Sequence, residues 1–299
     1  MSWTCVRVPA SSANLGPGFD ALGLALGIYL DCRFRLSEKL AIEVSGRDAQ
    51  AISTGEDNLI WQTALAVAAD TRSVLPPVEL RIENQIPVGK GLGSSAAALT
   101  AGVVIADQLL GLGWKRPRIL DEAARLEGHP DNVGACVLGS IVASAIDSGG
   151  SVRAVRVEMA SNFGVAIVVP DFVLPTVEAR AVLPDCYSRE DAIFNVQRAA
   201  LLISALATGT VSAFPTALED RFHQSYRAHL VPGLGDVLKL RAPGLLGCAL
   251  SGAGPSIIVF YEQGYQQVCD LVRQVLALQG HSSEILQVQI AAHGFTLEG

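Results

Sequence analysis

A glycine- and serine-rich stretch, "IPVGKGLGSSAAALTAG" at residues 86–102, has the composition of a loop that binds an anion. It lies between a predicted strand, "VELRIENQIP", and a predicted helix, "SSAAALTAGVVIADQLLG". The first amides of a helix lack intrahelical partners and lie at the positive end of the helix dipole. Gly89, Gly91 and Gly93 allow the loop to fold back, so that more amides point at one oxyanion. We therefore predict an anion site, with a glycine hinge capped by serines as the alternative.

Two common phosphate-binding loops do not match this stretch. A Walker A loop needs Ser or Thr directly after Gly-Lys, and here Lys90 is followed by Gly91. The dinucleotide-binding pattern G-x-G-x-x-G needs a glycine at the position of Ser94. The hydroxyl of Ser94 or Ser95 could instead ligate Mg²⁺, because this hard cation prefers oxygen ligands.

Five stretches of the sequence carry a resemblance to a known family. "PVGKGLGSSAA" at Pro87–Ala97 matches the P-x-x-x-G-L-G-S-S-A-A signature of the GHMP kinases, and "LSGAGPSIIVF" resembles their third, glycine-rich motif. "VPASSANLGPGFDALGLAL" is similar to the first motif of one GHMP family, the homoserine kinases. "EGHPDNVGACVLGS" and "FHQSYRAHLVPGL" resemble further segments of that family. The resemblance covers essentially the whole chain in the correct order.

The resemblance implies transfer of the ATP γ-phosphoryl group to the side-chain hydroxyl of L-homoserine, in threonine biosynthesis. It implies that Ser95 and Glu127 hold Mg²⁺, although a solvated helix end would also explain Glu127. Asn58 resembles the adenine-side residue of the family, and helix capping would explain it equally well. The loop amides of Gly91–Ser95 are implied to hold the β- and γ-phosphates. The loop residues implied to bind ATP are Pro87, Val88, Gly89, Lys90, Gly91, Leu92, Gly93, Ser94, Ser95, Ala96 and Ala97.

The same resemblance implies partners for each polar group of L-homoserine. Arg180 and Arg227 match a carboxylate clamp, for which the planar guanidinium is suited because it can bond bidentately. Asn14 and Asp20 match the residues that hold the amino group, and Asn132 would contact the reacting hydroxyl, so direct transfer without a strong protein base is plausible. The residues implied to be catalytic are Asn132, Glu127 and Arg180. Weaker candidates are His129 and Thr176, and the segment Gly252–Gly254 either closes the pocket or forms a tight turn.

Two rival interpretations remain open on the sequence alone. The chain could be another GHMP small-molecule kinase, such as one of the mevalonate pathway, or a non-catalytic GHMP-fold protein that senses a ligand or binds a partner. The stretch "SANLGPGFD" and the two arginines favour an amino-acid substrate over the first alternative. The intact glycine loop and Glu127 favour catalysis over the second.

The elements that must position these residues suggest an α+β fold with two domains, 1–158 and 159–299. We expect a first strand, "TCVRVP", that ends at Pro9, a helix that starts after Asn58, and the helix of residues 94–110. The second half alternates helices such as "EDAIFNVQRAALLISALATG" with strands such as "SEILQVQIAAHG". The resemblance implies an S5-like first domain and a ferredoxin-like second domain, with ATP between them.

Composition narrows the setting in which the protein works. Half of the 299 residues are hydrophobic, and the net charge of −7 argues against a nucleic-acid or anionic-membrane surface. Six scattered cysteines without a C-x-x-C pair predict free thiols, and five unclustered histidines make a structural zinc site improbable. We expect a cytoplasmic protein without a signal peptide or a membrane span. The family resemblance leaves a homodimer open.

Overall fold

A first sheet forms around two long strands, β1 (Thr4–Asn14) and β2 (Gly18–Leu36), which contain continuous runs of buried residues. The computed structural model describes residues 2–299, and within them this sheet has seven strands. The strand order is β11-β1-β2-β4-β3, while β5 pairs with β2 and with β6. The remaining strands are β3 (Ala41–Gly46), β4 (Val78–Asn84), β5 (Ile141–Ile146), β6 (Val152–Val157) and β11 (Thr296–Glu298).

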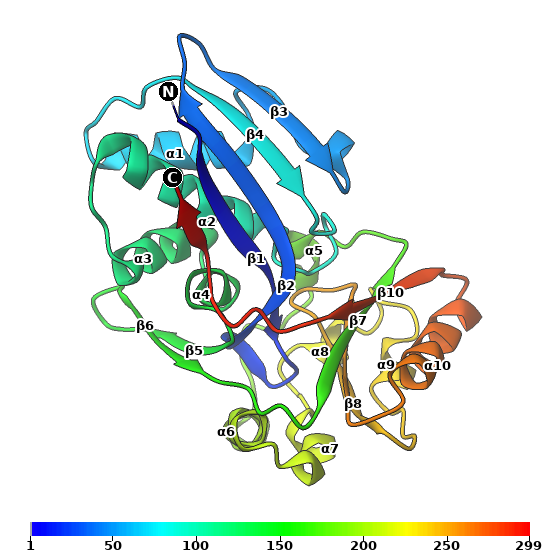
Figure 1. Cartoon of the computed structure of the whole chain (residues 1–299). Helices are drawn as coiled ribbons and strands as arrows, with labels where there is room; N and C mark the ends of the chain where they lie inside the picture. Colours follow the sequence, from blue (N-terminus) through cyan, green and yellow to red (C-terminus); the bar gives the residue numbers. More distant parts are fainter. Residues whose placement is uncertain (1) are drawn as a thin grey trace.

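Helices cover one face of this sheet, as Figure 1 shows. They are α1 (Leu59–Asp70), α2 (Ser94–Leu110), α3 (Arg116–Glu127) and α4 (Asp131–Leu138). Helix α2 is rich in Ala, Leu and Val, and its buried face packs on β1. It ends at Gly111, whose positive φ gives the usual left-handed helix terminus.

The second sheet has the order β10-β7-β9-β8 and is antiparallel throughout. Its strands are β7 (Gly164–Pro170), β8 (Leu245–Leu250), β9 (Ile257–Tyr261) and β10 (Ser283–Val288). One face is covered by α10 (Tyr265–Leu278), which buries Val268, Val272 and Leu276. The connections hold α5 (Thr176–Ala181), α6 (Arg189–Thr208), α7 (Phe214–Ala217), α8 (Gln224–Arg227) and α9 (Leu234–Val237). Two single turns complete the described elements, η1 (Ala49–Ala51) and η2 (Val211–Ala213).

A continuous apolar core joins the two sheets. Neighbouring residues of β7 point to opposite faces, so that Ile167 lies in the larger core and Val168 in the smaller one. The larger core also contains Leu24 of the first sheet together with Phe214 and Phe260 of the second half. The smaller core lies between the second sheet and α10. Shared packing of this kind fixes the loops that lie between the two sheets.

The end of the chain returns to the first sheet. Strand β11 pairs with β1, and Ile290 forms a bridge with Leu26 of β2. Ser140 donates from its backbone to Ala291, and Phe295 donates to the carbonyl of Cys136 in α4. The two sheets confirm the predicted α+β class. The division into 1–158 and 159–299 stays a prediction, and strand pairing places the final residues beside the first sheet.

One expectation about the elements was wrong, and one helix was not foreseen. Strand β1 does not end at Pro9 but continues to Asn14, because a register shift between Pro9 and Ala10 accommodates the missing amide. The sequence analysis assigned no element to helix α4, whose sequence "DNVGACVL" contains a glycine and two valines, residues of low helix propensity. Within residues 2–299, we find no helix with the length and apolar character of a membrane span.

Candidate active site

The glycine-rich loop between β4 and α2 has the backbone conformation that its composition requires. Gly89, Gly91 and Gly93 have φ of 69°, 74° and 69°, and the last caps α2. A side chain at Gly91 would collide with the carbonyl of Ser251, and one at Gly93 would collide with Ser11 Oγ. Only glycine can therefore follow this path, which brings the first amides of α2 to the wall of a cavity.

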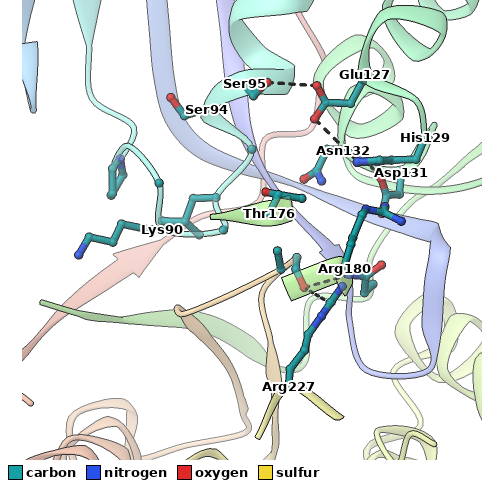
Figure 2. A pocket seen from close by; sticks show the side chains of 18 residues that line it. Lys90, Ser94, Ser95, Glu127, His129, Asp131, Asn132, Thr176, Arg180 and Arg227 are labelled. Carbon is teal, nitrogen blue, oxygen red and sulfur yellow. Dashed lines mark hydrogen bonds and ion pairs between the residues drawn. The ribbon is translucent and has the colours of Figure 1, made fainter. Parts of the chain in front are cut away.

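The cavity beside this loop collects most of the predicted site residues, as Figure 2 shows. Ser95, Glu127 and Asn132 lie on one side, from α2, α3 and α4. Arg180 and Arg227 lie on the other side, from α5 and α8. The further predicted residues that line it are Asn14, Pro87 and Gly89–Ser94. Thr176 and His129, the weaker candidates, also line the cavity.

Ser95 and Glu127 meet at the mouth of this cavity. Ser95 Oγ donates a hydrogen bond of 3.1 Å to Glu127 Oε2. The Glu127 side chain is only 14% exposed, and burial raises its pKa above the ordinary value, while nearby His129 opposes that shift. A largely buried carboxylate and a hydroxyl, both oxygen ligands beside helix amides, are a suitable pair for Mg²⁺.

Asp20 and Arg180 form an ion pair between the two halves of the chain. Arg180 donates from Nη2 to Asp20 Oδ1 at 2.7 Å and from Nη1 to Oδ2 at 3.2 Å. Asp20 lies near the start of β2 and has a φ of 54°, so its backbone adopts the left-handed conformation. The residues predicted to hold opposite charges of the substrate thus hold each other.

Asp131 is a cavity residue that the sequence analysis did not select. Its carboxylate accepts from the backbone of Asn132 at 2.7 Å and contacts His129 Nδ1 at 2.5 Å. Burial lowers the pKa of His129 and the contact with Asp131 raises it, with a net shift upward. Ligand atoms of Asp20, His129 and Asp131 all lie within 4.8 Å of one another. The segment His-Pro-Asp-Asn carried a signal for this residue, because Asp131 lies between two residues that the sequence analysis had selected, His129 and Asn132.

Asn132 has one half of its side-chain amide engaged. Ser11 Oγ donates to Asn132 Oδ1 at 2.8 Å, so the carbonyl end faces β1. The amide nitrogen is then left to donate into the cavity. In this orientation Asn132 can hold a hydroxyl oxygen or a phosphoryl oxygen, and it cannot accept a proton.

Arg227 and Asn14 meet at one carbonyl group. Arg227 Nη1 donates to the carbonyl of Gly252 at 3.1 Å, and Asn14 Nδ2 donates to the same oxygen at 3.0 Å. Asn14 Oδ1 also accepts from the backbone of Asp20. Arg227 is 1% exposed, and burial together with the charge of Arg180 lowers its pKa to about 10. The third glycine motif therefore organises the cavity through a backbone carbonyl.

A second, more apolar cavity lies on the other side of the glycine loop. Gly89, Ser94 and Ser95 line both cavities, so the loop separates them. Apolar walls of the second cavity come from Leu30, Ile52, Ile60 and Ile82. Asn58 and Val88 line it as well. An apolar slot next to an anion-binding loop suits a flat ring joined to phosphates.

Asn58 has a clear structural task beside this cavity. Its Oδ1 accepts from the amides of Ile60 and Trp61 and so caps α1, and its Nδ2 donates to the carbonyl of Ser53. The capping alternative is therefore observed. Asn58 nevertheless lines the slot, so the predicted adenine contact stays a prediction.

Three of the residues predicted to bind ATP, one in the loop and two in α2, direct their side chains elsewhere. Lys90 Nζ donates to the carbonyls of Pro170 and Phe172, each at 2.8 Å, at the end of β7. Figure 2 shows that this side chain extends away from Ser95 and Glu127. Ala96 and Ala97 are fully buried in the core. Binding of ATP by these three residues stays a prediction. The Lys90 side chain tethers the loop to the end of β7, and the two alanine side chains pack in the core.

Comparisons with known proteins match both halves of the chain. The family model described as "GHMP kinases N terminal domain" matches residues 58–140, and that described as "GHMP kinases C terminal" matches residues 202–274. A homoserine kinase of Solibacter usitatus is 70% identical over 99% of this chain and 97% of its own length. One of Deinococcus radiodurans is 41% identical over 98% and 96%, respectively. The crystal structure of homoserine kinase from Cytophaga hutchinsonii is similar with a TM-score of 0.82 at 26% identity, covering 100% of this chain and 98% of that one.

Proposed function

The chain belongs to the homoserine kinases, a family of the GHMP kinases, and on this premise we propose how its two joined cavities carry out the reaction of that family. The enzyme transfers a phosphoryl group from ATP to the side-chain hydroxyl of L-homoserine, which gives O-phospho-L-homoserine for threonine biosynthesis. The observation that carries the assignment of roles is that Arg180 and Arg227 line the cavity beside the glycine loop, with Asp20 paired to Arg180.

ATP spans the glycine loop in this proposal. The adenine ring enters the apolar slot beside Asn58, and the triphosphate lies over the amides of Gly91–Ser95. Positive φ at three glycines and the N-terminus of α2 support this placement, because both direct amides at one anion. The γ-phosphoryl group then faces the polar cavity. Mg²⁺ would be held by Ser95 and Glu127, and when bound it neutralises charge on the triphosphate.

L-Homoserine is held by its two charged groups. The carboxylate lies between Arg180 and Arg227, and the ammonium faces Asp20 with His129 and Asp131 near it. Two carboxylates that converge within one small volume favour a cation there. Asn14 orients this side of the cavity because its amide joins the backbone of Asp20 to Gly252.

The transfer itself is direct. The substrate hydroxyl oxygen attacks the γ-phosphorus, the bond to the β–γ bridging oxygen breaks, and ADP leaves with that electron pair. The hydroxyl proton is released to a phosphoryl oxygen or to water, so no strong protein base is needed. Asn132 donates its amide hydrogen to the reacting oxygens and holds them in line, while Arg180 orients the substrate.

A coupled ADP-release assay tests the proposal. L-Homoserine, mevalonate, shikimate and galactose are offered in turn, each with ATP and with or without Mg²⁺. We expect turnover only when L-homoserine and Mg²⁺ are present together. More efficient phosphorylation of mevalonate, shikimate or galactose would overturn the substrate assignment, and turnover after metal removal would overturn the role given to Ser95 and Glu127.

The setting of the enzyme is also part of this proposal. All six cysteines are free thiols, and four of them are buried. Unpaired cysteines in this number are typical of a reducing compartment. We therefore place the enzyme in the cytoplasm.

A further inference from the structure

We propose that His223 is a positioning residue: it holds the guanidinium of Arg227 in the orientation that binds the substrate carboxylate. The motif "FHQSYRAHLVPGL" contains both residues, and only Arg227 has a role in the reaction described so far. The inference rests on the proposed placement of the substrate carboxylate at Arg227, and it adds the reason why that arginine faces the cavity.

His223 is fully buried one helical turn before Arg227. The backbone amide of Arg227 donates to the carbonyl of His223 at 3.0 Å, which places the two side chains on the same side of α8. Arg227 Nη1 lies 3.0 Å from His223 Nδ1, and His223 Nε2 lies 2.8 Å from the carbonyl oxygen of Gly16. The imidazole ring also stacks on Phe19, with ring centroids 5.4 Å apart.

These two contacts allow a single protonation state of the ring. A guanidinium can only donate, so His223 Nδ1 must carry a lone pair. A carbonyl oxygen can only accept, so His223 Nε2 must carry the hydrogen. The neutral Nε2–H tautomer satisfies both contacts, whereas a protonated ring would direct an N–H at Arg227.

The surroundings of the ring agree with this state. Burial and then the charge of Arg227 lower the pKa of His223, and together they outweigh the carboxylates of Asp220 and Asp20, which act in the opposite direction. Asp220 lies 3.7 Å from Nε2, and its carboxylate already accepts from the backbone amides of Phe222, His223 and Gln224. Asp220 therefore fixes the chain around His223 and does not take the proton of Nε2.

Arg227 is left with one free end. Its Nε donates to the carbonyl of Ala179, and its Nη1 donates to Gly252 and His223. Within residues 2–299, Nη2 makes no hydrogen bond to the protein, and Arg227 lines the polar cavity. His223 thus acts as the acceptor that prevents rotation of the guanidinium and leaves Nη2 for the carboxylate.

His223 also connects this arginine to the turn before β2 and to the start of that strand, where Asp20 lies. Gly16 and Phe19, its other two partners, belong to the segment that leads into Asp20. The Phe19 ring lies 5.6 Å from both Arg180 Cζ and Arg227 Cζ. One imidazole therefore sets the distance between the group that binds the ammonium and a group that binds the carboxylate.

A matched pair of substitutions separates this role from simple packing. His223→Asn keeps an acceptor near the position of Nδ1 and loses the donor to Gly16, while His223→Gln keeps a donor near Nε2 and loses the acceptor for Arg227. Both remove the ring, so their loss of stability should be similar. We expect His223→Gln to raise KM for L-homoserine about tenfold or more, and His223→Asn to raise it less than about threefold. KM for ATP should stay unchanged in both.

L-Homoserinol, which lacks the carboxylate, provides the control substrate. The two variants should differ on L-homoserine and agree on L-homoserinol, because only the former uses Arg227. Equal effects of both variants on L-homoserine, or parallel losses on both substrates, would overturn the inference. If the wild-type enzyme does not turn over L-homoserine, the proposed function fails instead, so the two failures are distinguishable.

The native protein gives a second measurement that does not depend on a variant folding. The ¹⁵N shifts of His223, assigned through contacts of its ring with Phe19, should report a neutral Nε2–H imidazole from about pH 6 to about pH 9. A ring that titrates in this range, or one in the Nδ1–H form, would overturn the inference.

Discussion

Arg180, which lines the polar cavity, is joined to Asp20 by two hydrogen bonds, although the two residues come from opposite halves of the chain. Both side chains are about one-third exposed, at 37% and 35%. When a zwitterionic substrate enters between them, Arg180 exchanges the carboxylate of Asp20 for that of the substrate. Asp20 in turn exchanges the guanidinium of Arg180 for the substrate ammonium. The ion pair therefore holds both residues in place for binding without leaving either charge uncompensated.

Asp20→Asn should lower kcat/KM for L-homoserine roughly ten- to hundredfold, because a charge-assisted hydrogen bond to the ammonium is worth about 1.5–3 kcal/mol when sheltered from water. KM for ATP should change little, since Asp20 is not among the residues that line the two cavities beside the glycine loop. Steady-state kinetics with each substrate varied in turn measure both values.

4-Hydroxybutyrate, which keeps the carboxylate and hydroxyl of L-homoserine but lacks the amine, is the control for Asp20→Asn. In this variant, kcat/KM for 4-hydroxybutyrate should fall less than kcat/KM for L-homoserine. The remaining loss measures how much Asp20 contributes by orienting Arg180. The preference of the enzyme for L-homoserine should therefore narrow. An equal loss of kcat/KM on both compounds would mean that Asp20 supports the local backbone and orients Arg180 but does not contact the ammonium.

Ser95→Ala should reduce kcat by about tenfold or more, because a ligand of the metal acts most strongly where charge develops on the transferring group. Ser95 is the serine that contacts Glu127, at 3.1 Å. Ser94→Ala is the matched control and should have a milder effect, since Ser94 is the first residue of α2. Small and equal effects of the two substitutions on kcat would place the metal elsewhere.

The dependence on Mg²⁺ should vary with pH through Glu127. Burial raises the pKa of this carboxyl, so on acidification it is protonated at a higher pH than an exposed glutamate. A protonated carboxyl does not ligate Mg²⁺, and the apparent affinity for the metal should therefore fall as the pH falls through the raised pKa. Higher Mg²⁺ should move the acidic limb of kcat/KM for ATP to lower pH. A limb that stays in place at every Mg²⁺ concentration would contradict the assignment.

Gly23→Ala should destabilise the protein and reduce kcat, because a side chain there would collide with the carbonyl of Asp131 at the start of α4. Overpacking of this kind costs about 1–3 kcal/mol, which chemical denaturation measures. Gly235→Ala is the control, since its new methyl group meets nothing within 4 Å and the backbone needs no positive φ. Equal free energies of unfolding of the two variants would show that the close contact between β2 and α4 does not require glycine at position 23.

The glycine loop and the helices with clear periodicity could be predicted from the sequence, because their signals are local. Helix α2 begins at Ser94 and stops at Gly111, as the capping rules indicate. The family resemblance supplied Arg180, Arg227 and Asp20, which no local pattern would have brought together.

The remaining parts of the site depend on contacts between distant segments. His223 and Arg227 are near each other in sequence, but the carbonyls of Gly16 and Gly252 that complete their environment are not. The side chain of Lys90 fits a phosphate contact by position, yet two carbonyls at the end of β7 lie within its reach. Spacing along the chain does not show which of two acceptors is closer in space.

The return of the chain to the first sheet has a consequence for how the enzyme is made. Asn132 is synthesised before the midpoint of the sequence, but the helix that carries it is held by Phe295, whose amide and carbonyl bind Cys136 and Arg116. During translation the glycine loop and the helix that carries Asn132 are therefore synthesised long before the C-terminal residues that contact this helix. The first half of the chain can become compact during translation. Its catalytic geometry is complete only after residues 290–298 have been synthesised and have paired with β1 and β2.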